Sequence, residues 1–156
     1  MIGHYQRIVV PVKGVPSDAR VLEVVGLLAH RHPVSITLIY VVEVLQSMPL
    51  DAELPVEINK GEAVLRQAEH TARHGLGHKL ERVSTELLQA RSAGAAIVDE
   101  AIERGADAII MAAVNHHRHG RTTMGETAGY ILKNAPCEVL LLRQAPGASH
   151  GAEEQR

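Results

Sequence analysis

The chain has 156 residues, 46% of them hydrophobic, and its 16 Lys and Arg against 18 Asp and Glu give a formal net charge of -2. This length is that of one domain with a real hydrophobic core. The balanced charge argues against nucleic acid as a partner, and the absence of Trp and Phe argues against a surface on which bases stack.

Short apolar runs rich in β-branched residues alternate along the chain with segments of helical periodicity. The apolar runs predict five strands, at residues 7–12, 35–44, 80–88, 106–112 and 138–142. The periodic segments predict four helices, at 19–32, 60–74, 93–104 and 126–134. Ser17 or Asp18 is positioned to cap the first helix, and residues 46–57 and 115–121 are expected to be irregular.

This alternation is typical of an α/β fold, and it predicts one doubly wound, Rossmann-like parallel sheet with helices on both faces. No internal repeat or linker divides the chain. We therefore expect a single domain over residues 1–143, followed by a disordered tail over 144–156, which is small and polar.

The cysteine content and the N-terminus indicate a compartment. Cys137 is the only cysteine, so no intrachain disulfide can form, as is usual for proteins of a reducing compartment. The N-terminus lacks the charged and then apolar layout of a secretory signal. The longest apolar run, residues 34–45, is too short to span a bilayer. The sequence predicts a cytoplasmic protein without membrane insertion.

The region from Gly105 to Arg143 contains a strand, a polar and basic stretch, a helix and a second strand. In an open parallel sheet, such a stretch lies at the carboxyl end of its strand and faces the N-terminus of the next helix. Free backbone N–H groups and the positive end of the helix dipole point there, and this environment suits an anion such as phosphate.

Three stretches of the chain resemble the universal stress protein family: Ile8-Val9-Val10-Pro11-Val12, Gly105-Ala106-Asp107-Ala108-Ile109-Ile110-Met111 and Asn134-Ala135-Pro136-Cys137-Glu138-Val139-Leu140. The order of elements is similar too, from Arg7 to Arg143. The resemblance implies a five-stranded parallel sheet and homodimers joined through the last strand, Glu138 to Leu142. Some members bind ATP or another adenine nucleotide, and others bind none.

The nucleotide-binding members carry Gly, two residues, Gly, nine residues, and then Gly followed by Ser or Thr. On this chain the three glycine positions are Ala112, Asn115 and Gly125, and the Ser/Thr position is Glu126. The acidic residue that such members hold near the ribose, at the end of the first strand, is Lys13 here. The chain departs from the pattern at four positions, two of which change charge.

The resemblance implies a small regulatory protein of the stress response that binds ATP, AMP or a cyclic adenine nucleotide, with Mg²⁺ only alongside ATP. We expect at most very slow hydrolysis. The backbone at Val12 and Val41 would meet the base, whereas Asn115, Gly125 and Thr127 would meet the phosphates. The candidate site residues are Pro11, Val12, Lys13, Val41, Met111, Ala112, Asn115, Arg118, Arg121, Gly125, Glu126 and Thr127.

Two charged positions of this set also have structural interpretations. Thr123 and Glu126 are spaced as a capping box at the start of a helix. Lys13 and Glu126 could also pair across the crevice and fill the space that a nucleotide would use.

The basic stretch 115–121 has three interpretations. It is a solvated loop, an anion-binding lid in which Arg118 and Arg121 supply the positive charge, or a metal site built on His117 and His119.

An alternative from another class is a nucleotide-free dimeric interaction module. It would act through the segment from Leu45 to Pro55 on a protein partner, such as a transporter or a kinase. Nothing in the sequence resembles a nucleophile–base pair, so no catalytic residue is predicted.

Overall fold

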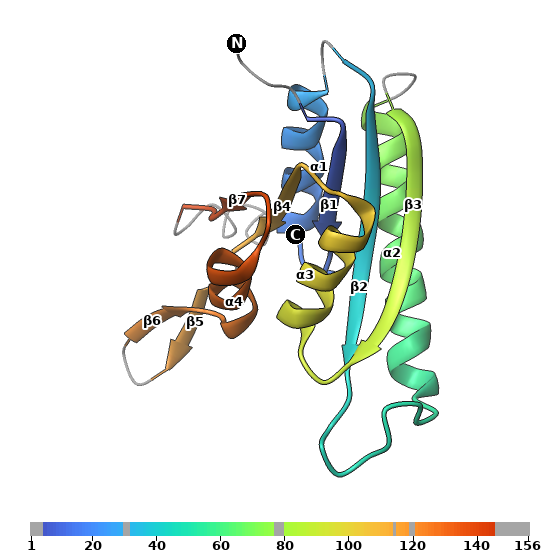
Figure 1. Ribbon diagram of the computed structural model, residues 1–156, viewed down its shortest axis with the longest axis vertical. Helices are drawn as coiled ribbons and strands as arrows, with labels where there is room; N and C mark the ends of the chain where they lie inside the picture. Colours follow the sequence, from blue (N-terminus) through green and yellow to red (C-terminus); the bar gives the residue numbers. More distant parts are fainter. Residues whose placement is uncertain (1–4, 30–31, 77–79, 114, 119–120, 146–156) are drawn as a thin grey trace, which may run out of the picture.

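The computed structural model describes residues 5–29, 32–76, 80–113, 115–118 and 121–145. Its centre is a parallel sheet of five strands in the order β3-β2-β1-β4-β7 (Figure 1). The strands are β1 (Arg7–Pro11), β2 (Val34–Glu43), β3 (Leu80–Ala90), β4 (Ala108–Ala112) and β7 (Glu138–Leu142). The helices are α1 (Ser17–Leu28), α2 (Pro55–Leu76), α3 (Ala93–Arg104) and α4 (Glu126–Asn134). The predicted doubly wound parallel sheet is confirmed.

The hydrophobic core has two layers, one on each face of the sheet. Because side chains alternate along a strand, Ile8 and Val10 pack under α1 and α2, whereas Val9 packs under α3 and α4. All three side chains are at most 1% exposed. This two-sided burial explains why β1 is apolar at consecutive positions.

Several element boundaries differ from the prediction. Helix α2 begins at Pro55 rather than at Lys60, so the expectation of irregular structure was wrong for residues 55–57. Proline suits the first position of a helix because that position needs no N–H donor. Helix α1 runs from Ser17 to Leu28, earlier than predicted, and β3 continues to Ala90.

Helix α3 has a capping residue at each end. The Ser92 Oγ accepts a hydrogen bond from the Ala95 N–H, 3.3 Å away. At the other end Gly105 adopts a left-handed backbone with φ 60°, which glycine takes without strain.

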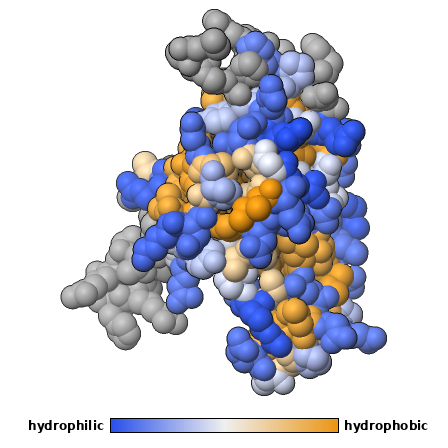
Figure 2. Space-filling model, in the orientation of Figure 1, coloured by the Kyte–Doolittle hydropathy of each residue, from blue (hydrophilic) through white to orange (hydrophobic). Residues whose placement is uncertain are grey.

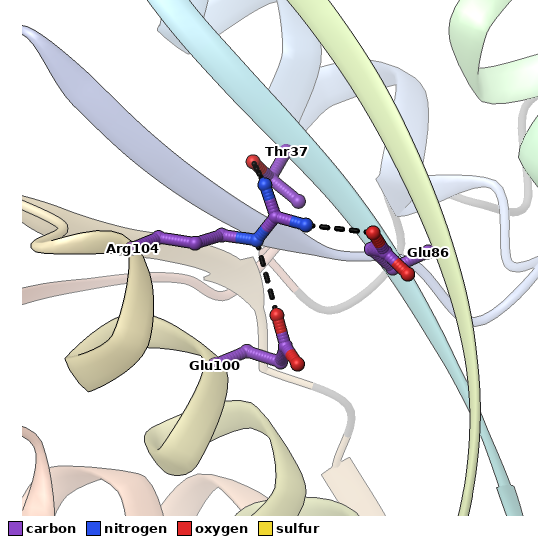
Figure 3. A network of polar contacts seen from close by, with 4 residues as sticks. All are labelled: Thr37, Glu86, Glu100 and Arg104. Carbon is purple, nitrogen blue, oxygen red and sulfur yellow. Dashed lines mark hydrogen bonds and ion pairs between the residues drawn. The ribbon is translucent and has the colours of Figure 1, made fainter.

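A polar network connects the end of α3 to the sheet (Figure 3). The guanidinium of Arg104 donates to Glu100 at 3.0 Å and to Glu86 of β3 at 2.7 Å. It also donates to the hydroxyl of Thr37, the one polar side chain that is buried among the described residues. The network therefore satisfies a buried hydroxyl while it fixes α3 on β2 and β3.

The basic stretch expected to be irregular forms a β-hairpin instead. Strands β5 (Asn115–Arg118) and β6 (Arg121–Met124) pair antiparallel, with Asn115 opposite Met124 and Arg118 opposite Arg121. In Figure 1 this hairpin extends from the sheet beside α4. The prediction of a loop was wrong for these residues, and residues 119–120 lie outside the described part of the chain.

Parts of other predictions also lie outside the described residues. These are the tail from residue 146 onward and the side chains of the histidines in the hairpin. Within the described ranges, no helix combines the length and the apolar character needed to cross a membrane.

Candidate functional site

The order of the strands reverses beside β1. From β1 the chain moves outward to β2 and β3, and it then returns to the other side of β1 to form β4 and β7. In open parallel sheets, ligands bind outside the carboxyl ends of the strands at such a reversal. The candidate site therefore lies where β1 and β4 end.

The β1–α1 loop, residues 12–16, follows β1 at one side of this candidate site, and we call it the first wall. Pro11 and Val12 are buried, and the Val12 N–H donates to the Ile39 carbonyl oxygen of β2 at 2.9 Å. Lys13 is half-buried, and Gly14 has a positive φ of 77°. The wall is thus fixed by sheet pairing up to Val12, and it turns at Gly14.

The carboxylate of Asp18 occupies the backbone donors of this loop. Its Oδ2 accepts from the N–H of Gly14 at 2.7 Å, and from those of Lys13 and Val15 at 3.2 Å. Burial raises the pKa of this carboxyl above its ordinary value, although the three N–H groups act in the opposite direction. The loop amides are therefore already paired and do not offer a free anion site.

This role of Asp18 differs from the helix cap that the sequence predicted. Asp18 lies inside the first turn of α1 and accepts from N–H groups that precede the helix. The residues from Gly14 to Ser17 indicate a turn in the sequence. The hydrogen bonds that Asp18 accepts, however, depend on the positive φ of Gly14, which only the structure provides.

The opposite wall comes from β4 and the N-terminus of α4. Met111 and Ala112 are buried at the end of β4, and the Ala113 N–H continues the pairing to the Leu142 carbonyl oxygen at 2.8 Å. Gly125 is the N-cap residue of α4 and carries no side chain that could accept a hydrogen bond. Among the described residues, the first N–H groups of α4 thus have no side-chain partner, in contrast to the β1–α1 loop.

The structure brings some of the predicted site residues together. Strand β1 pairs with β4 through Ile8 and Val9. Beyond this pairing, β1 ends at Pro11, which Val12 and Lys13 follow, and β4 ends with Met111 and Ala112. Val41 lies on β2, half-buried against the core layer under α3 and α4. Figure 2 shows an apolar area on this face, toward the end where β2 and β3 finish.

The other predicted site residues follow β4 in the chain. Asn115 and Arg118 lie on β5 and Arg121 on β6, so their backbone belongs to the hairpin. Glu126 and Thr127 are the first two residues of α4.

Two structural interpretations of Glu126 are wrong. The N-cap of α4 is Gly125, and Thr123 belongs to β6, so no capping box forms. Lys13 and Glu126 are both described, and they make no ion pair with one another. Glu126 is exposed in the first turn of α4, where its negative charge interacts favourably with the positive end of the helix dipole.

Cys137 is half-buried beside the core layer under α3 and α4. Burial, and after it the negative charge of Asp107, raise the pKa of this thiol. A thiol of this kind is a poor nucleophile at neutral pH. In the described ranges no three His, Cys, Asp or Glu residues are grouped so that they could hold a metal ion.

The sequence profile of the universal stress protein family matches residues 4–143. The chain belongs to the universal stress protein family. The match covers every strand and helix of the sheet just described. A comparison with curated protein sequences found no match.

Solved structures of universal stress proteins have the same fold. One from Archaeoglobus fulgidus has a TM-score of 0.70 at 21% identity, covering 88% of this chain and 98% of its own. A universal stress protein from Archaeoglobus fulgidus in complex with dAMP has a TM-score of 0.65 at 20% identity, covering 89% of this chain and 98% of its own. A universal stress protein in complex with cAMP has a TM-score of 0.64 at 18% identity, covering 92% and 100%. At these identities the likeness shows the fold alone.

Proposed function

We propose that this universal stress protein is a cytoplasmic regulatory protein that binds an adenine nucleotide at the carboxyl ends of β1 and β4. The observation that carries the proposal is the contrast between the two walls of the crevice. The amides of the β1–α1 loop are paired with Asp18, whereas α4 has a glycine, Gly125, as its N-cap, and no side chain that the structure describes caps this N-terminus. A phosphate group is therefore best placed at Gly125 and Thr127.

The base would lie toward the β1 side, over the backbone at Val12 and beside Val41. The structures of relatives with dAMP and cAMP support an adenine ligand. Lys13, with its positive charge at the same wall, fits a ligand with a negative group near the ribose. A cyclic nucleotide has such a group, and Mg²⁺ is needed only if the ligand is ATP.

Glu126 is the main electrostatic obstacle to this proposal. At about 4 Å, a carboxylate and a phosphate charge repel each other by about 1 kcal/mol in water and by several kcal/mol at a lower effective dielectric constant. The arginines at Arg118 and Arg121 would offset this repulsion. The affinity for ATP should therefore depend on Glu126 more strongly than the affinity for a cyclic nucleotide, which carries less charge.

Calorimetric titration of the purified protein with ATP, AMP and cAMP, at about pH 7.5 with and without Mg²⁺, tests the proposal. We expect binding with a dissociation constant of tens of micromolar or lower. For scale, a dissociation constant of about 1 μM corresponds to a binding free energy of about -8 kcal/mol. Gly125→Glu should abolish it, and Glu126→Ser should tighten ATP binding by about fivefold, which corresponds to about 1 kcal/mol. Glu103→Gln, which removes an exposed charge at the far end of α3, is the matched control.

A second candidate function has its own observation. Leu45 and Leu50 are 68% and 48% exposed in the segment between β2 and α2, and Val56 is 76% exposed in the first turn of α2. Gln89 donates to the carbonyl oxygens of Leu50 and Ala52, at 3.3 and 3.0 Å, so the segment is held in place. An ordered apolar surface of this kind fits a protein partner, such as a transporter or a kinase.

One pair of substitutions separates the two functions. If the native protein shows no heat with any nucleotide, and Lys13→Asp with Glu126→Ser creates ATP binding, the protein is an interaction module whose nucleotide site has been lost. In both cases we propose a homodimer through β7, an edge strand with half-buried side chains from Val139 to Leu142. Sedimentation equilibrium measures this assembly.

A further inference from the structure

A cavity of about 480 Å³ lies between α1 and α2, on the face of the sheet opposite to α4. Its walls include Gly14 of the β1–α1 loop, Asp18 and Leu22 of α1, and Val64, Ala68 and Thr71 of α2. Its volume is in the range of small-molecule sites in proteins. The candidate nucleotide crevice does not account for it.

Small side chains on both helices leave this space open. Ala19 of α1 faces Ala63 and Ala68 of α2 across the cavity. At one end the loop approaches α2 so closely that a Cβ on Gly14 would lie 2.8 Å from Cγ2 of Val64. The β1–α1 loop is therefore packed closely against α2 at Gly14, and Gly14 and Val64 both line the cavity.

Among the described residues, the polar side chains that line the cavity are Asp18, Gln67 and Thr71, and Asp18 is the ionisable one. Gln67 offers both a donor and an acceptor, whereas Oδ1 of Asp18 receives only a long hydrogen bond of 3.4 Å from the Lys13 N–H. The Thr71 hydroxyl donates to the Gln67 carbonyl oxygen at 3.0 Å, so its oxygen lone pairs remain available. A ligand that donates hydrogen bonds satisfies both groups, whereas a carboxylate or a phosphate is repelled by Asp18.

We propose that this cavity binds a small apolar molecule that carries an ammonium group, with Oδ1 of Asp18 as its polar anchor. The apolar part lies against Leu22, Val64 and Ala68. The ammonium group gives the half-buried carboxylate the charged hydrogen-bond partner that the protein does not supply, and such bonds are stronger than neutral ones.

The charges that act on Asp18 are positive. Lys13 is the one side chain whose charge acts noticeably on this carboxylate, and the N-terminus of α1 contributes a partial positive charge. Neither of them contacts Asp18 as a charged side-chain donor in the cavity, since the bonds to Asp18 all come from backbone N–H groups. The cavity therefore retains a negative group that faces apolar surroundings.

The site does not depend on nucleotide binding, but it shares a wall with the nucleotide crevice. Gly14 and Val15 line the cavity, and Lys13, which precedes them, lies at the crevice. A molecule held by Asp18 would act on the loop that carries Lys13.

Titration of isotope-labelled protein with tryptamine, followed by amide chemical shifts and without nucleotide, tests the proposal. Tryptamine combines an ammonium group with an apolar ring, and indole-3-propionate carries a carboxylate on a similar ring. We expect saturable shifts of Gly14, Val15 and Thr71 with tryptamine, and an affinity at least about tenfold weaker for indole-3-propionate, the effect of one charged hydrogen bond. Equal shifts with both probes, or none with tryptamine, would overturn the proposal.

Variants locate the site. Asp18→Asn should weaken tryptamine binding by about tenfold, whereas Glu62→Gln, which removes an exposed charge from α2 outside the lining, should leave it unchanged. Ala63→Trp should place a large ring at the lining, narrow the cavity and weaken binding. Thermal melts establish that each variant is folded, and unchanged binding in folded Ala63→Trp places tryptamine elsewhere and rejects the site.

Discussion

The Nη1 of Arg104, at the end of α3, donates a hydrogen bond across 3.2 Å to the hydroxyl of Thr37 on β2. The same guanidinium reaches Glu86 and Glu100, so a single side chain joins β2, β3 and α3. Thr37 is only 8% exposed. Removal of Arg104 thus leaves a buried hydroxyl and two carboxylates without this partner.

We expect Arg104→Met to lower the free energy of unfolding by about 1 to 3 kcal/mol, because a buried acceptor and two partly buried carboxylates lose their donor. Urea denaturation measures the change. Arg73→Met is the matched control, since the Arg73 side chain is 58% exposed and pairs with Glu69 on the same helix. It should cost about 0.5 kcal/mol or less. Equal losses in the two variants would mean that Thr37 does not depend on Arg104.

Two glycines of α2 should respond to alanine with opposite signs. A Cβ on Gly61 would lie 2.6 Å from Cδ1 of Tyr40 and 2.9 Å from Cδ1 of Leu87, whereas a Cβ on Gly75 meets nothing within 4 Å. We expect Gly61→Ala to destabilise the protein by about 1 to 3 kcal/mol through overpacking. Gly75→Ala should stabilise it by about 0.5 kcal/mol through helix propensity.

Thermal or urea unfolding of both variants measures these changes. Tyr40→Leu combined with Gly61→Ala should recover part of the loss, because the ring that the new methyl group meets is removed. Stabilisation by Gly61→Ala alone contradicts the packing of α2 on β2.

Asp18 should make stability fall as the pH rises. Burial raises the pKa of its carboxyl in the folded protein above the ordinary value of 3.8. The stabilisation from the protonated group is fully present below the unfolded pKa and is lost as the pH rises through the folded pKa. The free energy of unfolding of the native protein minus that of Asp18→Asn should therefore decrease from about pH 3 to about pH 7.

Urea denaturation at several pH values gives this difference. Asp51→Asn removes the same charge from an exposed position and measures the effect of net charge alone. An increase with pH would show that the three loop N–H groups outweigh burial.

The ionisation of Tyr5 should report its contact with β7. The Tyr5 hydroxyl donates a hydrogen bond to the carboxylate of Glu138. This bond, with burial and the charge of Glu138, raises the pKa of Tyr5 from 10.0 to about 12. The associated stability is present below about pH 10 and is lost as the pH rises toward 12.

Absorbance of tyrosinate during an alkaline titration measures this pKa. In Glu138→Gln the step assigned to Tyr5 should move toward 10.0, and in Tyr5→Phe it should disappear. A titration curve that is the same in the native protein and in Glu138→Gln would contradict the contact.

The sheet could be predicted because its strands carry a strong local signal. Runs such as Ile8 to Val12 and Ala108 to Ala112 are apolar at every position, which is typical of strands covered on both faces. The alternation of strands and helices is compatible with more than one strand order, so the reversal beside β1 is seen only in the structure. The position of the candidate site, between residues 11–13 and 111–127, comes from the family resemblance and stays a prediction.

The hairpin and the exact contacts of Asp18 could not be predicted. In β5 and β6 both faces are polar, so no apolar alternation marks a strand. The role of Asp18 depends on the backbone of Gly14, and the cavity depends on the separation of α1 and α2. Tertiary packing determines these distances, and no local pattern records them.

The central place of β1 also affects the chain while it is being synthesised. One edge of β1 pairs with β2 as soon as residue 39 has emerged, but the other edge waits for β4, which begins at Ala108. During all of the intervening translation, this strand has an open side that can pair with a foreign strand. A nascent chain that pauses before β4 therefore exposes one edge of an apolar strand, and β4 and α4, which the candidate site requires, form only when the last third of the protein is made.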